Sequence, residues 1–414
     1  MTAGAAELEA VAAAARAARA TVADLADVAD KFLDDALRAM AALLGRRAGE
    51  VLTANDADMR AARAGGIADA VADRLRLDPA RLDAIAGQLR ALAEVPAGPS
   101  QRTVRELPGG LLLAERRKPV GVIGANFEAR PNVVTDIASQ FVKSRNAGVL
   151  RTGSAAIRSA VALADEVIGP ALQAAGLDPA MIQLVRTPGQ GAARALVSQP
   201  GLIPLVILRG SGASTRALAA EAARHGVRTM AHADGGAVLF VDAGADLAMA
   251  ERLIETSLDR LGVCNRLNLL LLHDELWDQV LPRLRQLLAR LGISASLPPH
   301  AHPLGHEWAL DAGREATVTV ARAASPRAAA EIANEETSGL AAGIVTADGD
   351  AAAEFLGVYA GTGAFWNSST RLLDGFKLLA VPETGISIDA VPGPRGPVTF
   401  RDLYLRQYVV TPAA

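Results

Sequence analysis

The chain has very little cysteine and few aromatic residues. Cys264 is the only cysteine in 414 residues, and Phe, Trp and Tyr together make up 3% of the sequence. A single cysteine excludes an internal disulfide framework and any cysteine-based zinc site, and it fits a reducing compartment, so we expect a cytoplasmic protein. The aromatic residues are too few to form the base-stacking platforms of proteins that bind single-stranded nucleic acids.

The chain also lacks an excess of charge of either sign, and it lacks long apolar runs. The 42 Lys and Arg residues against 45 Asp and Glu residues leave a net charge of −3, which offers no general attraction to nucleic-acid phosphates or anionic lipids. No apolar run reaches the roughly 18 residues that a membrane-spanning helix needs, and residues 1–20 lack the apolar segment of a signal peptide. We therefore expect no nucleic-acid partner and no membrane association.

The six histidines do not form a recognisable metal site. None of them belongs to an H-x-x-x-H pair on an evident helix, and the three that cluster, His300, His302 and His306, have no obvious carboxylate partner. The sequence therefore predicts no bound metal.

With 50% hydrophobic residues, the composition is typical of a soluble protein. A chain of 414 residues is longer than one compact core usually accommodates, so we expect two or three domains. Residues 5–95 are rich in Ala, and leucines and Met40 between 33 and 44 recur at helical spacing, which predicts helices. We expect breaks at Asn55-Asp56 and at Gly65-Gly66, and a new helix that begins at Asp78-Pro79.

After residue 119, short apolar runs alternate with helix-like stretches. Strands are expected at 120–124, 147–150, 182–185, 205–208 and 238–241, and again at 267–272, 316–321 and 343–346. Such alternation at spacings of roughly 25–35 residues is typical of βαβ units, which build a parallel sheet covered on both faces.

We therefore predict an α/β protein with two consecutive α/β domains and a small β element. The first would be made of residues 1–103, with its helices, and 117–240. The second, 241–366, would carry Cys264. A hairpin at 104–116 and a late strand within 391–414 would form the small element. An apolar strand at the end of a chain often pairs with another subunit, so we expect a homo-oligomer, a dimer or a tetramer.

Cys264 is the first candidate for chemistry. Free cysteines are mostly small buried hydrophobes, and that reading stays open here. The flanking Gly262 and Asn265 favour a nucleophile, since glycine permits close approach of a substrate and a nearby backbone N–H can hold an oxyanion.

Two strand-to-turn segments are candidates for anion binding. Arg209, Gly210 and Ser211 lie between an apolar strand and a helix, which suits either an anion site at a helix N-terminus or simply a tight turn. Arg151 and Ser154 follow another strand, and the cation could meet a ribose phosphate or remain a solvated loop residue.

His232 is a further candidate, either as an acid or base or as a structural histidine. It lies just before the strand expected at 238–241.

Several motifs in the same order closely resemble the γ-glutamyl phosphate reductases, a branch of the aldehyde dehydrogenase superfamily. The matching segments are Lys118–Gly124, the Glu-Ala-Arg-Pro-Asn motif at 128–132, Leu150–Ser154, the Gly-Val-Cys-Asn motif at 262–265, Asn367–Arg371 with Asp374-Gly375, Glu383–Ser387, and Arg395–Pro397 with Tyr408–Val410. Together they span nearly the whole chain.

The resemblance implies reduction of L-glutamyl 5-phosphate by NADPH to glutamate 5-semialdehyde and phosphate, a step of proline biosynthesis. Cys264 would form a thioacyl enzyme, with Asn265 and His232 as further catalytic residues. The first α/β domain would be a Rossmann-like cofactor-binding domain and the second the catalytic domain. Arg151 and Ser154 would hold the adenosine ribose of NADP(H), and the turn of Arg209, Gly210 and Ser211 would hold its pyrophosphate. The resemblance places the substrate at Glu128, Arg130, Asn132, Arg266 and Asn268.

Some positions depart from the family pattern. Arg266 and Asn268 stand where the family has a small residue and a glutamate, so the pocket could accept acyl groups that lack an α-amino group. Three readings stay open: a glutamyl phosphate reductase, a related acyl-phosphate or acyl-CoA reductase with another acyl group, and a catalytically lapsed paralogue.

Overall fold

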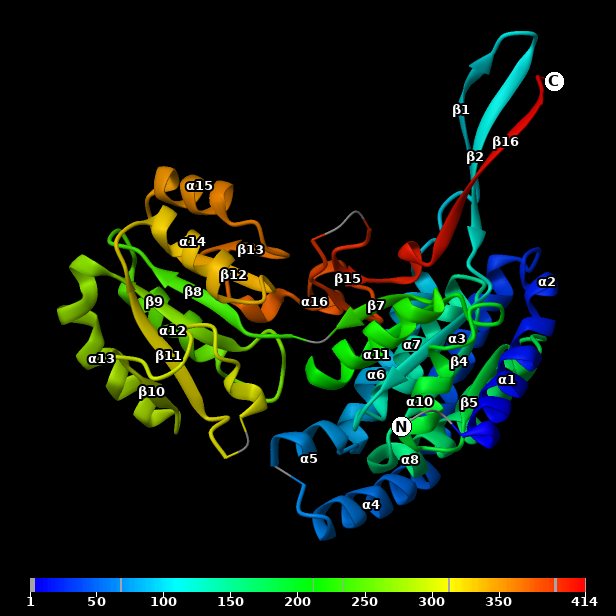
Figure 1. Ribbon diagram of the computed structural model, residues 1–414, viewed down its shortest axis with the longest axis horizontal. Coiled ribbons are helices and arrows are strands. Elements are labelled where there is room, and N and C mark those ends of the chain that lie inside the picture. Colours follow the sequence, from blue (N-terminus) through cyan, green and yellow to red (C-terminus); the bar gives the residue numbers. More distant parts are fainter. Residues whose placement is uncertain are drawn as a thin grey trace.

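The computed structural model describes residues 4–413, apart from 68, 211, 233, 312 and 391–392. It contains two α/β lobes, each built on its own parallel sheet, and a narrow third sheet that stands out from the first lobe (Figure 1). The predicted fold class, two consecutive α/β domains with a small β element, is confirmed.

The N-terminal region is helical, as predicted, and packs on the first lobe. Its helices are α1 (Ala5–Ala20), α2 (Val22–Leu25), α3 (Asp30–Arg46), α4 (Ala48–Ala64), α5 (Asp69–Leu75) and α6 (Pro79–Glu94).

Two of the predicted helix boundaries are found and one is wrong. Asp78 caps α6, because its side chain accepts a hydrogen bond from the backbone N–H of Arg81, and α4 ends at Gly65. The break expected at Asn55-Asp56 lies inside α4. Asn55 is 1% exposed, and its side-chain amide bonds to Leu75 and Leu77 instead of interrupting its own helix.

The sheet of the first lobe is parallel, with the strand order β5-β4-β3-β6-β7. Its strands are β3 (Val122–Phe127), β4 (Ala147–Thr152), β5 (Ile182–Val185), β6 (Leu205–Arg209) and β7 (Arg228–His232). The chain runs from β3 outward to β5 and returns to the other side of β3 with β6. The carboxyl ends of β3 and β6 therefore form the crevice where open α/β sheets bind ligands.

Helices cover both faces of this sheet. They are α7 (Asn132–Lys143), α8 (Ile157–Leu163), α9 (Gly169–Ala174), α10 (Gln190–Leu196) and α11 (Gly212–His225), with a π-helical turn, η2 (Ala164–Ile168), and two 3-10 turns, η1 (Ser154–Ala156) and η3 (Pro179–Met181).

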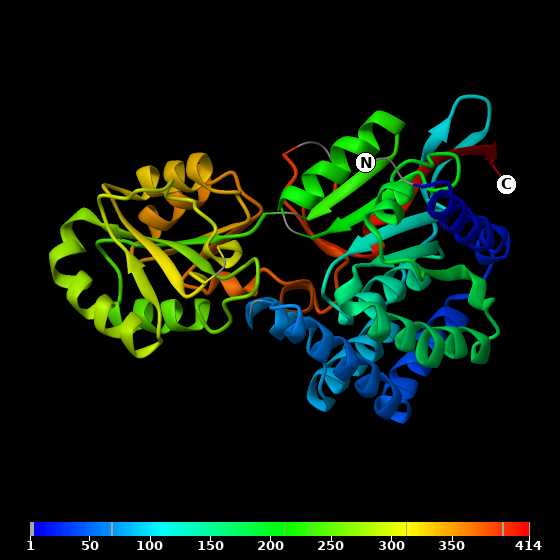
Figure 2. The ribbon, with the colours of Figure 1, turned by 60° about the horizontal axis from the view of Figure 1, so that its bottom comes forward.

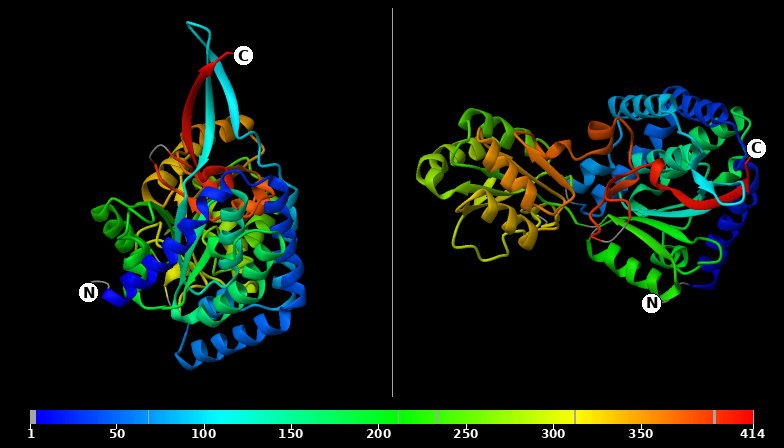
Figure 3. Two further views of the ribbon diagram at one scale, coloured as in Figure 1. Left: turned by 90° about the vertical axis from the view of Figure 1, so that its right-hand side faces the viewer. Right: turned by 90° about the horizontal axis from the view of Figure 1, so that it is seen from above.

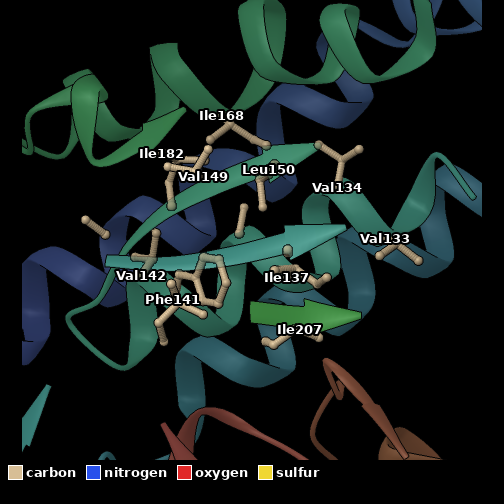
Figure 4. Packing of buried hydrophobic residues seen from close by; sticks show 14 of the residues in the cluster. Val133, Val134, Ile137, Phe141, Val142, Val149, Leu150, Ile168, Ile182 and Ile207 are labelled. Atoms are coloured by element: carbon tan, nitrogen blue, oxygen red, sulfur yellow. The ribbon is translucent and has the colours of Figure 1, made fainter. Parts of the chain in front are cut away.

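Side chains of α7 fill the core against β3 and β4 (Figure 4). Gly148 on β4 permits this packing, since a Cβ there would lie 2.2 Å from the ring of Phe141. The close contact fixes α7, and with it the residues at its N-terminus, against the sheet.

The second lobe contains a parallel sheet with the order β10-β11-β9-β8-β12-β13. Its strands are β8 (Ala237–Val241), β9 (Leu267–His273), β10 (Ser294–Ser296), β11 (Thr317–Ala323), β12 (Ala341–Val345) and β13 (Gly363–Trp366). Its helices are α12 (Leu247–Ser257), α13 (Trp277–Arg290), α14 (Pro326–Glu336) and α15 (Gly349–Val358), with 3-10 turns η4 (Asp274–Leu276) and η5 (Trp308–Leu310). The domain boundary expected after residue 240 falls inside β8, which belongs wholly to this sheet.

The third sheet is antiparallel and consists of β1 (Gln101–Leu107), β2 (Leu111–Pro119) and β16 (Tyr404–Pro412), with β2 in the centre. It extends away from both lobes (Figure 3). Leu405, Tyr408 and Val410 on β16 are each more than half exposed, so this sheet presents apolar side chains to its surroundings.

The chain between β13 and β16 runs back between the two lobes (Figure 2). It contains η6 (Thr370–Leu372), α16 (Gly375–Leu379), a small ladder of β14 (Gly385–Ser387) with β15 (Gly396–Val398), and η7 (Phe400–Asp402). None of the helices described is long and apolar enough to cross a membrane.

Candidate active site

Cys264 lies where the two lobes meet, on the loop between α12 and β9. The loop is fixed to the start of β8, since Gly236 N–H donates to the carbonyl of Cys264 at 2.8 Å and Ala237 N–H donates to that of Arg266 at 3.0 Å. The backbone N–H of Cys264 has no acceptor within the described part of the chain. It is thus available to a ligand oxygen next to the thiol.

Asn265 ties this loop to the segment between the lobes. Its amide donates to the carbonyl of Leu373 at 2.9 Å, its side-chain oxygen accepts from Arg371, and its carbonyl accepts from Thr370 Oγ1 at 3.0 Å. Asn265 is 3% exposed. Its amide is fully engaged in these bonds, so Asn265 holds the loop of Cys264 in place and has no free amide group for the direct catalytic part that the sequence suggested.

A second contact reaches the loop from the N-terminal helices. Arg74 on α5 donates to the carbonyl of Gly262, and the neighbouring Arg260 pairs with Asp73 at 2.9 Å. Three regions far apart in the sequence therefore hold the nucleophile loop.

Two arginines face Cys264 in a cavity of 260 Å³. Arg130 follows β3 and Arg209 ends β6, so both lie at the crevice of the first sheet. Neither guanidinium has an ion-pair or hydrogen-bond partner among the residues described, which leaves two cations to bind an anionic group of a ligand. Burial raises the pKa of the Cys264 thiol, and the charges of Arg130 and Arg209 oppose that rise.

Three carboxyl groups lie in the same cavity, Asp136, Asp374 and Glu383. Burial raises the pKa of Asp136 to about 7, and burial together with the charge of Asp374 raises the pKa of Glu383. Asn132 donates to Asp136 at 2.9 Å, and Gly375 N–H donates to Glu383 at 2.6 Å. Clustered carboxyls in a buried site would each be stabilised by a cationic group of a ligand, such as an ammonium.

A smaller cavity of 80 Å³ lies on the other side of Cys264 and contains His232, at the end of β7, and Gly210. Burial lowers the pKa of His232 to about 4, so the imidazole is neutral near pH 7. Its two ring nitrogens have no partner among the described residues. His232 can therefore donate or accept a hydrogen bond there, but it cannot supply a positive charge.

Glu307 brings a carboxylate into this smaller cavity from a distant loop. Burial raises its pKa, with Asp234 adding to the effect, and the Gly235 backbone, Arg74 and Arg266 oppose it.

A third cavity, of 490 Å³, lies beyond the ends of β3 and β4 and is lined by Arg151, Ser154 and Glu128. Arg151 is 2% exposed and donates to Asn126 Oδ1 and to the carbonyl of Gly189, both at 2.9 Å. Its Nε–H is buried without a partner in the described structure. The cavity therefore offers a buried cationic donor to a ligand.

The structure corrects the expected location of several site residues. Glu128 lies in this third cavity and accepts from Ser214 Oγ at 3.2 Å, so it does not reach the substrate side. Arg209, expected at the pyrophosphate, faces Cys264 instead. Arg130 and Asn132 lie beside the thiol, as expected of substrate-binding residues. Ser211 lies outside the described residues.

Arg266 and Asn268 do not face the substrate cavity. The guanidinium of Arg266 is buried and donates to the carbonyls of Leu267, Glu315 and Thr317. Asn268 is also buried, and it holds the loop that carries Glu307 through hydrogen bonds with the backbone of His306 and Trp308. The sequence analysis assigned both to the substrate because they are close to Cys264 in the chain, but their side chains point into the second lobe.

The sequence analysis missed the carboxyls of the site. Asp374 and Glu383 lie inside segments that it matched to the reductase family, and that match was a signal for them. Asp136 follows Asn132 by one helical turn, which was a second signal. Glu307 had none, because it belongs to a histidine-rich loop far from any matched motif.

No group of three or more His, Cys, Asp or Glu side chains is arranged to hold a metal ion in the described part of the chain. The three clustered histidines contact Trp308 and one another instead.

Comparisons with known proteins show what the chain as a whole resembles. The family model described as the aldehyde dehydrogenase family matches residues 1–303. γ-Glutamyl phosphate reductase from Thermotoga maritima is 25% identical and superposes with a TM-score of 0.85, over 97% of this chain and 98% of its own.

Two further structures show similarity in fold. γ-Glutamyl phosphate reductase from Saccharomyces cerevisiae is 23% identical, with a TM-score of 0.51 over 96% of both chains. An acetylating aldehyde dehydrogenase from Geobacillus thermoglucosidasius is 15% identical, with a TM-score of 0.73 over 98% of this chain and 97% of its own.

Proposed function

The chain belongs to the aldehyde dehydrogenase family, and from that premise we propose that it reduces an aminoacyl phosphate, L-glutamyl 5-phosphate, to L-glutamate 5-semialdehyde and phosphate. The observation that carries this proposal is the composition of the 260 Å³ cavity at Cys264. It combines two unpaired arginines with three carboxyl groups around one thiol.

Two charged parts of the substrate, the phosphoryl group and the α-ammonium group, have matching groups in the cavity. Arg130 and Arg209 suit the phosphoryl group, because guanidinium binds phosphate through charge-assisted and often bidentate hydrogen bonds. Asp136, Asp374 and Glu383 suit the α-ammonium group. The family has a glutamate where this chain has Asn268. In the proposed complex, these three carboxyl groups bind the amino group in place of that glutamate.

In the proposed mechanism, the Cys264 thiolate attacks the acyl carbon, and phosphate leaves next to Arg130 and Arg209. Both cations favour the thiolate and the departing phosphate. The N–H of Cys264 is placed to hold the oxyanion of the tetrahedral intermediate. Asn265 keeps the loop in place throughout. The product of this step is a thioacyl enzyme at Cys264.

The cofactor that fits the remaining cavities is NADPH. When bound, it supplies the hydride that reduces the thioacyl group to the aldehyde. The 490 Å³ cavity, with the unpartnered Nε–H of Arg151 and the hydroxyl of Ser154, suits its adenosine ribose. Gly210 and His232 line the 80 Å³ cavity that leads to the thiol and suit its nicotinamide end.

The test is the reverse reaction with glutamate 5-semialdehyde and NADP⁺. We expect NADPH to form at a rate that depends on inorganic phosphate. Turnover that requires CoA instead would support an acyl-CoA reductase, and no turnover with any aldehyde would support a lapsed paralogue.

We also propose a homo-oligomer, a dimer or a tetramer, that works in proline biosynthesis in the cytoplasm. The apolar side chains exposed on β16 support association through the third sheet. The lone cysteine, Cys264, supports a reducing compartment.

A further inference from the structure

The 260 Å³ cavity at Cys264 contains more cations than one phosphoryl group needs. Arg260, on the same loop as Cys264, lines it together with Arg130 and Arg209. Burial lowers the pKa of Arg130 to about 9, and the charges of neighbouring arginines, Arg260 among them, add to this effect. Cations that crowd one another in this way are stabilised by bound anions. The arrangement therefore favours a ligand with two separate anionic groups.

The guanidinium of Arg260 is held in place but keeps free donors. Its Nε and Nη2 both donate to Oδ2 of Asp73 on α5, at 3.2 and 2.9 Å. Its Nη1 has no partner in the described part of the chain. The side chain is 44% exposed and also lines a second, wider cavity of 870 Å³, which fits a position at the mouth of the Cys264 cavity.

Gln88 on α6 is another polar group at this cavity. Ile85 and Leu89 of the same helix are buried in the core of the first lobe, whereas Gln88 is half-buried. Its side-chain amide forms no hydrogen bond with any residue that the structure describes. An amide and a guanidinium that line one cavity can bind the two oxygens of a carboxylate, because both donate hydrogen bonds.

Arg371 also lines the cavity, but its guanidinium is engaged within the protein. Its Nε donates to Asp259 at 2.7 Å, and its Nη1 donates to the side-chain oxygen that fixes the nucleophile loop. Arg130 and Arg209 are assigned above to the phosphoryl group next to the thiol. Arg260 is therefore the cation left for a second anionic group.

We infer that Arg260 and Gln88 bind the α-carboxylate of the substrate, which makes the N-terminal helices part of the specificity site. This inference rests on the proposed reduction of L-glutamyl 5-phosphate. Three carbon–carbon bonds separate the acyl carbon of that substrate from the α-carbon, so the carboxylate lies at the end remote from Cys264. The carboxyl groups of the cavity remain available to the ammonium group on the same carbon.

The experiment compares two aldehydes that differ only in the carboxylate, glutamate 5-semialdehyde and 4-aminobutanal, in the phosphate-dependent reduction of NADP⁺. We expect the native kcat/KM to be at least about 10²-fold higher for the glutamate aldehyde, because an analogue without the carboxylate leaves polar groups of the site unpaired.

Two variants test the residues separately. In Arg260→Gln the ratio of the two kcat/KM values should fall about 10-fold or more, through loss of one charge-assisted contact, while kcat/KM for 4-aminobutanal stays within about 2-fold of native. Gln88→Leu should lower the ratio in the same direction, by several-fold, and it leaves the ion pair of Arg260 with Asp73 intact.

A matched control is Arg252→Gln. Arg252 is exposed on α12, and it is not among the residues that line the cavity. The ratio should stay within about 2-fold of the native value, as for a surface substitution away from the site.

The outcomes separate this inference from the reductase proposal. A smaller native preference, or a ratio in Arg260→Gln within about 2-fold of the native one, overturns the carboxylate site and leaves the reductase proposal standing. An equal loss of kcat/KM for both aldehydes also overturns it, since that loss shows a structural role only. No phosphate-dependent turnover of either aldehyde contradicts the reductase proposal and, with it, this site.

Discussion

The side-chain amide of Asn132 donates to the carboxyl group of Asp136, one turn later on α7, at 2.9 Å. Both side chains point from the first turns of that helix into the cavity of Cys264. The packing of Phe141 over Gly148 fixes the helix, so a core contact of the first lobe determines where this buried carboxyl lies in the cavity.

Asp136→Asn should stabilise the fold at alkaline pH. Burial raises the pKa of Asp136 to about 7 from 3.8, so the folded state holds its proton more tightly than the unfolded state does. The charged form therefore costs stability above pH 7, and this cost disappears as the pH falls towards 4. We expect the variant to gain about 4 kcal/mol at pH 8, from roughly three pKa units at about 1.4 kcal/mol each, and very little at pH 4, measured by urea unfolding.

The same variant should bind the amino-acid aldehyde poorly, with a KM for glutamate 5-semialdehyde raised at least about 10-fold, the loss of one charge-assisted contact. A native KM, together with an unchanged pH dependence of stability, would contradict the assignment of Asp136.

Arg130→Gln should weaken phosphate binding and make the thiol less acidic. Loss of one charge-assisted contact costs about 1.5–3 kcal/mol, so the KM for phosphate should rise roughly 10- to 150-fold. Iodoacetamide labels Cys264 as the only thiol, and the midpoint of its rate against pH should move upward. Arg186→Gln is the control, because Arg186 is exposed and pairs with Asp165. An unchanged midpoint in Arg130→Gln would contradict its contact with the thiolate.

Cys264→Ser should abolish aldehyde oxidation while leaving NADPH binding intact, since a serine hydroxyl without an activating base is a poor nucleophile near pH 7. Fluorescence titration with NADPH checks binding, and the phosphate-dependent assay checks turnover. Substantial activity in Cys264→Ala would contradict covalent catalysis.

Glu128→Gln should shift the cofactor preference towards NADPH. The Glu128 carboxylate lines the cavity proposed for the adenosine ribose, together with Arg151. Arg151 favours a 2′-phosphate there, whereas the negative charge of Glu128 opposes Arg151 and can accept from a ribose hydroxyl, so the native preference for NADPH is smaller than Arg151 alone would give. We expect the Kd for NADPH to fall several-fold and that for NADH to rise, measured by titration of the free enzyme. Equal changes for both cofactors would place Glu128 away from the 2′ position.

Asn55→Ala should destabilise the first lobe by about 2–3 kcal/mol, because it leaves buried groups of Leu75 and Leu77 without partners. The neighbouring exposed Asp56→Ala is a matched control and should change the free energy of unfolding by less than about 0.5 kcal/mol. Equal effects of the two substitutions would contradict the role assigned to the Asn55 amide.

The central strands could be predicted from the sequence because they are buried on both faces and form continuous apolar runs. Some edge strands lack this signal, although the edge strand β5 was predicted. β7 begins with the exposed Arg228, and β10 has only three residues, so both escaped the sequence analysis. The helix break predicted at Asn55 was wrong because the hydrogen-bond partners of its side chain lie on another segment of the chain.

The site was predictable only in part. Cys264 and Arg130 lie in motifs that the sequence analysis singled out, and both line the 260 Å³ cavity. The direction of a side chain outside a regular element cannot be read from the chain, so Arg266 was placed at the substrate although it bonds to backbone carbonyls of the second lobe. Glu307 lies close to Cys264 only because of the tertiary fold, so no local sequence pattern could predict its place in the site.

The three anchors of the nucleophile loop also determine when the thiol becomes reactive during synthesis. One anchor, Arg74, is synthesised early. Asn265 can form its hydrogen bond with the carbonyl of Leu373 only after 108 further residues have been synthesised. Domains fold in order as the chain emerges, so a nascent first lobe can already be compact while the loop is still loose. The chain therefore carries an unassembled active site until almost its full length has been translated, and truncated products should be folded in part but catalytically silent.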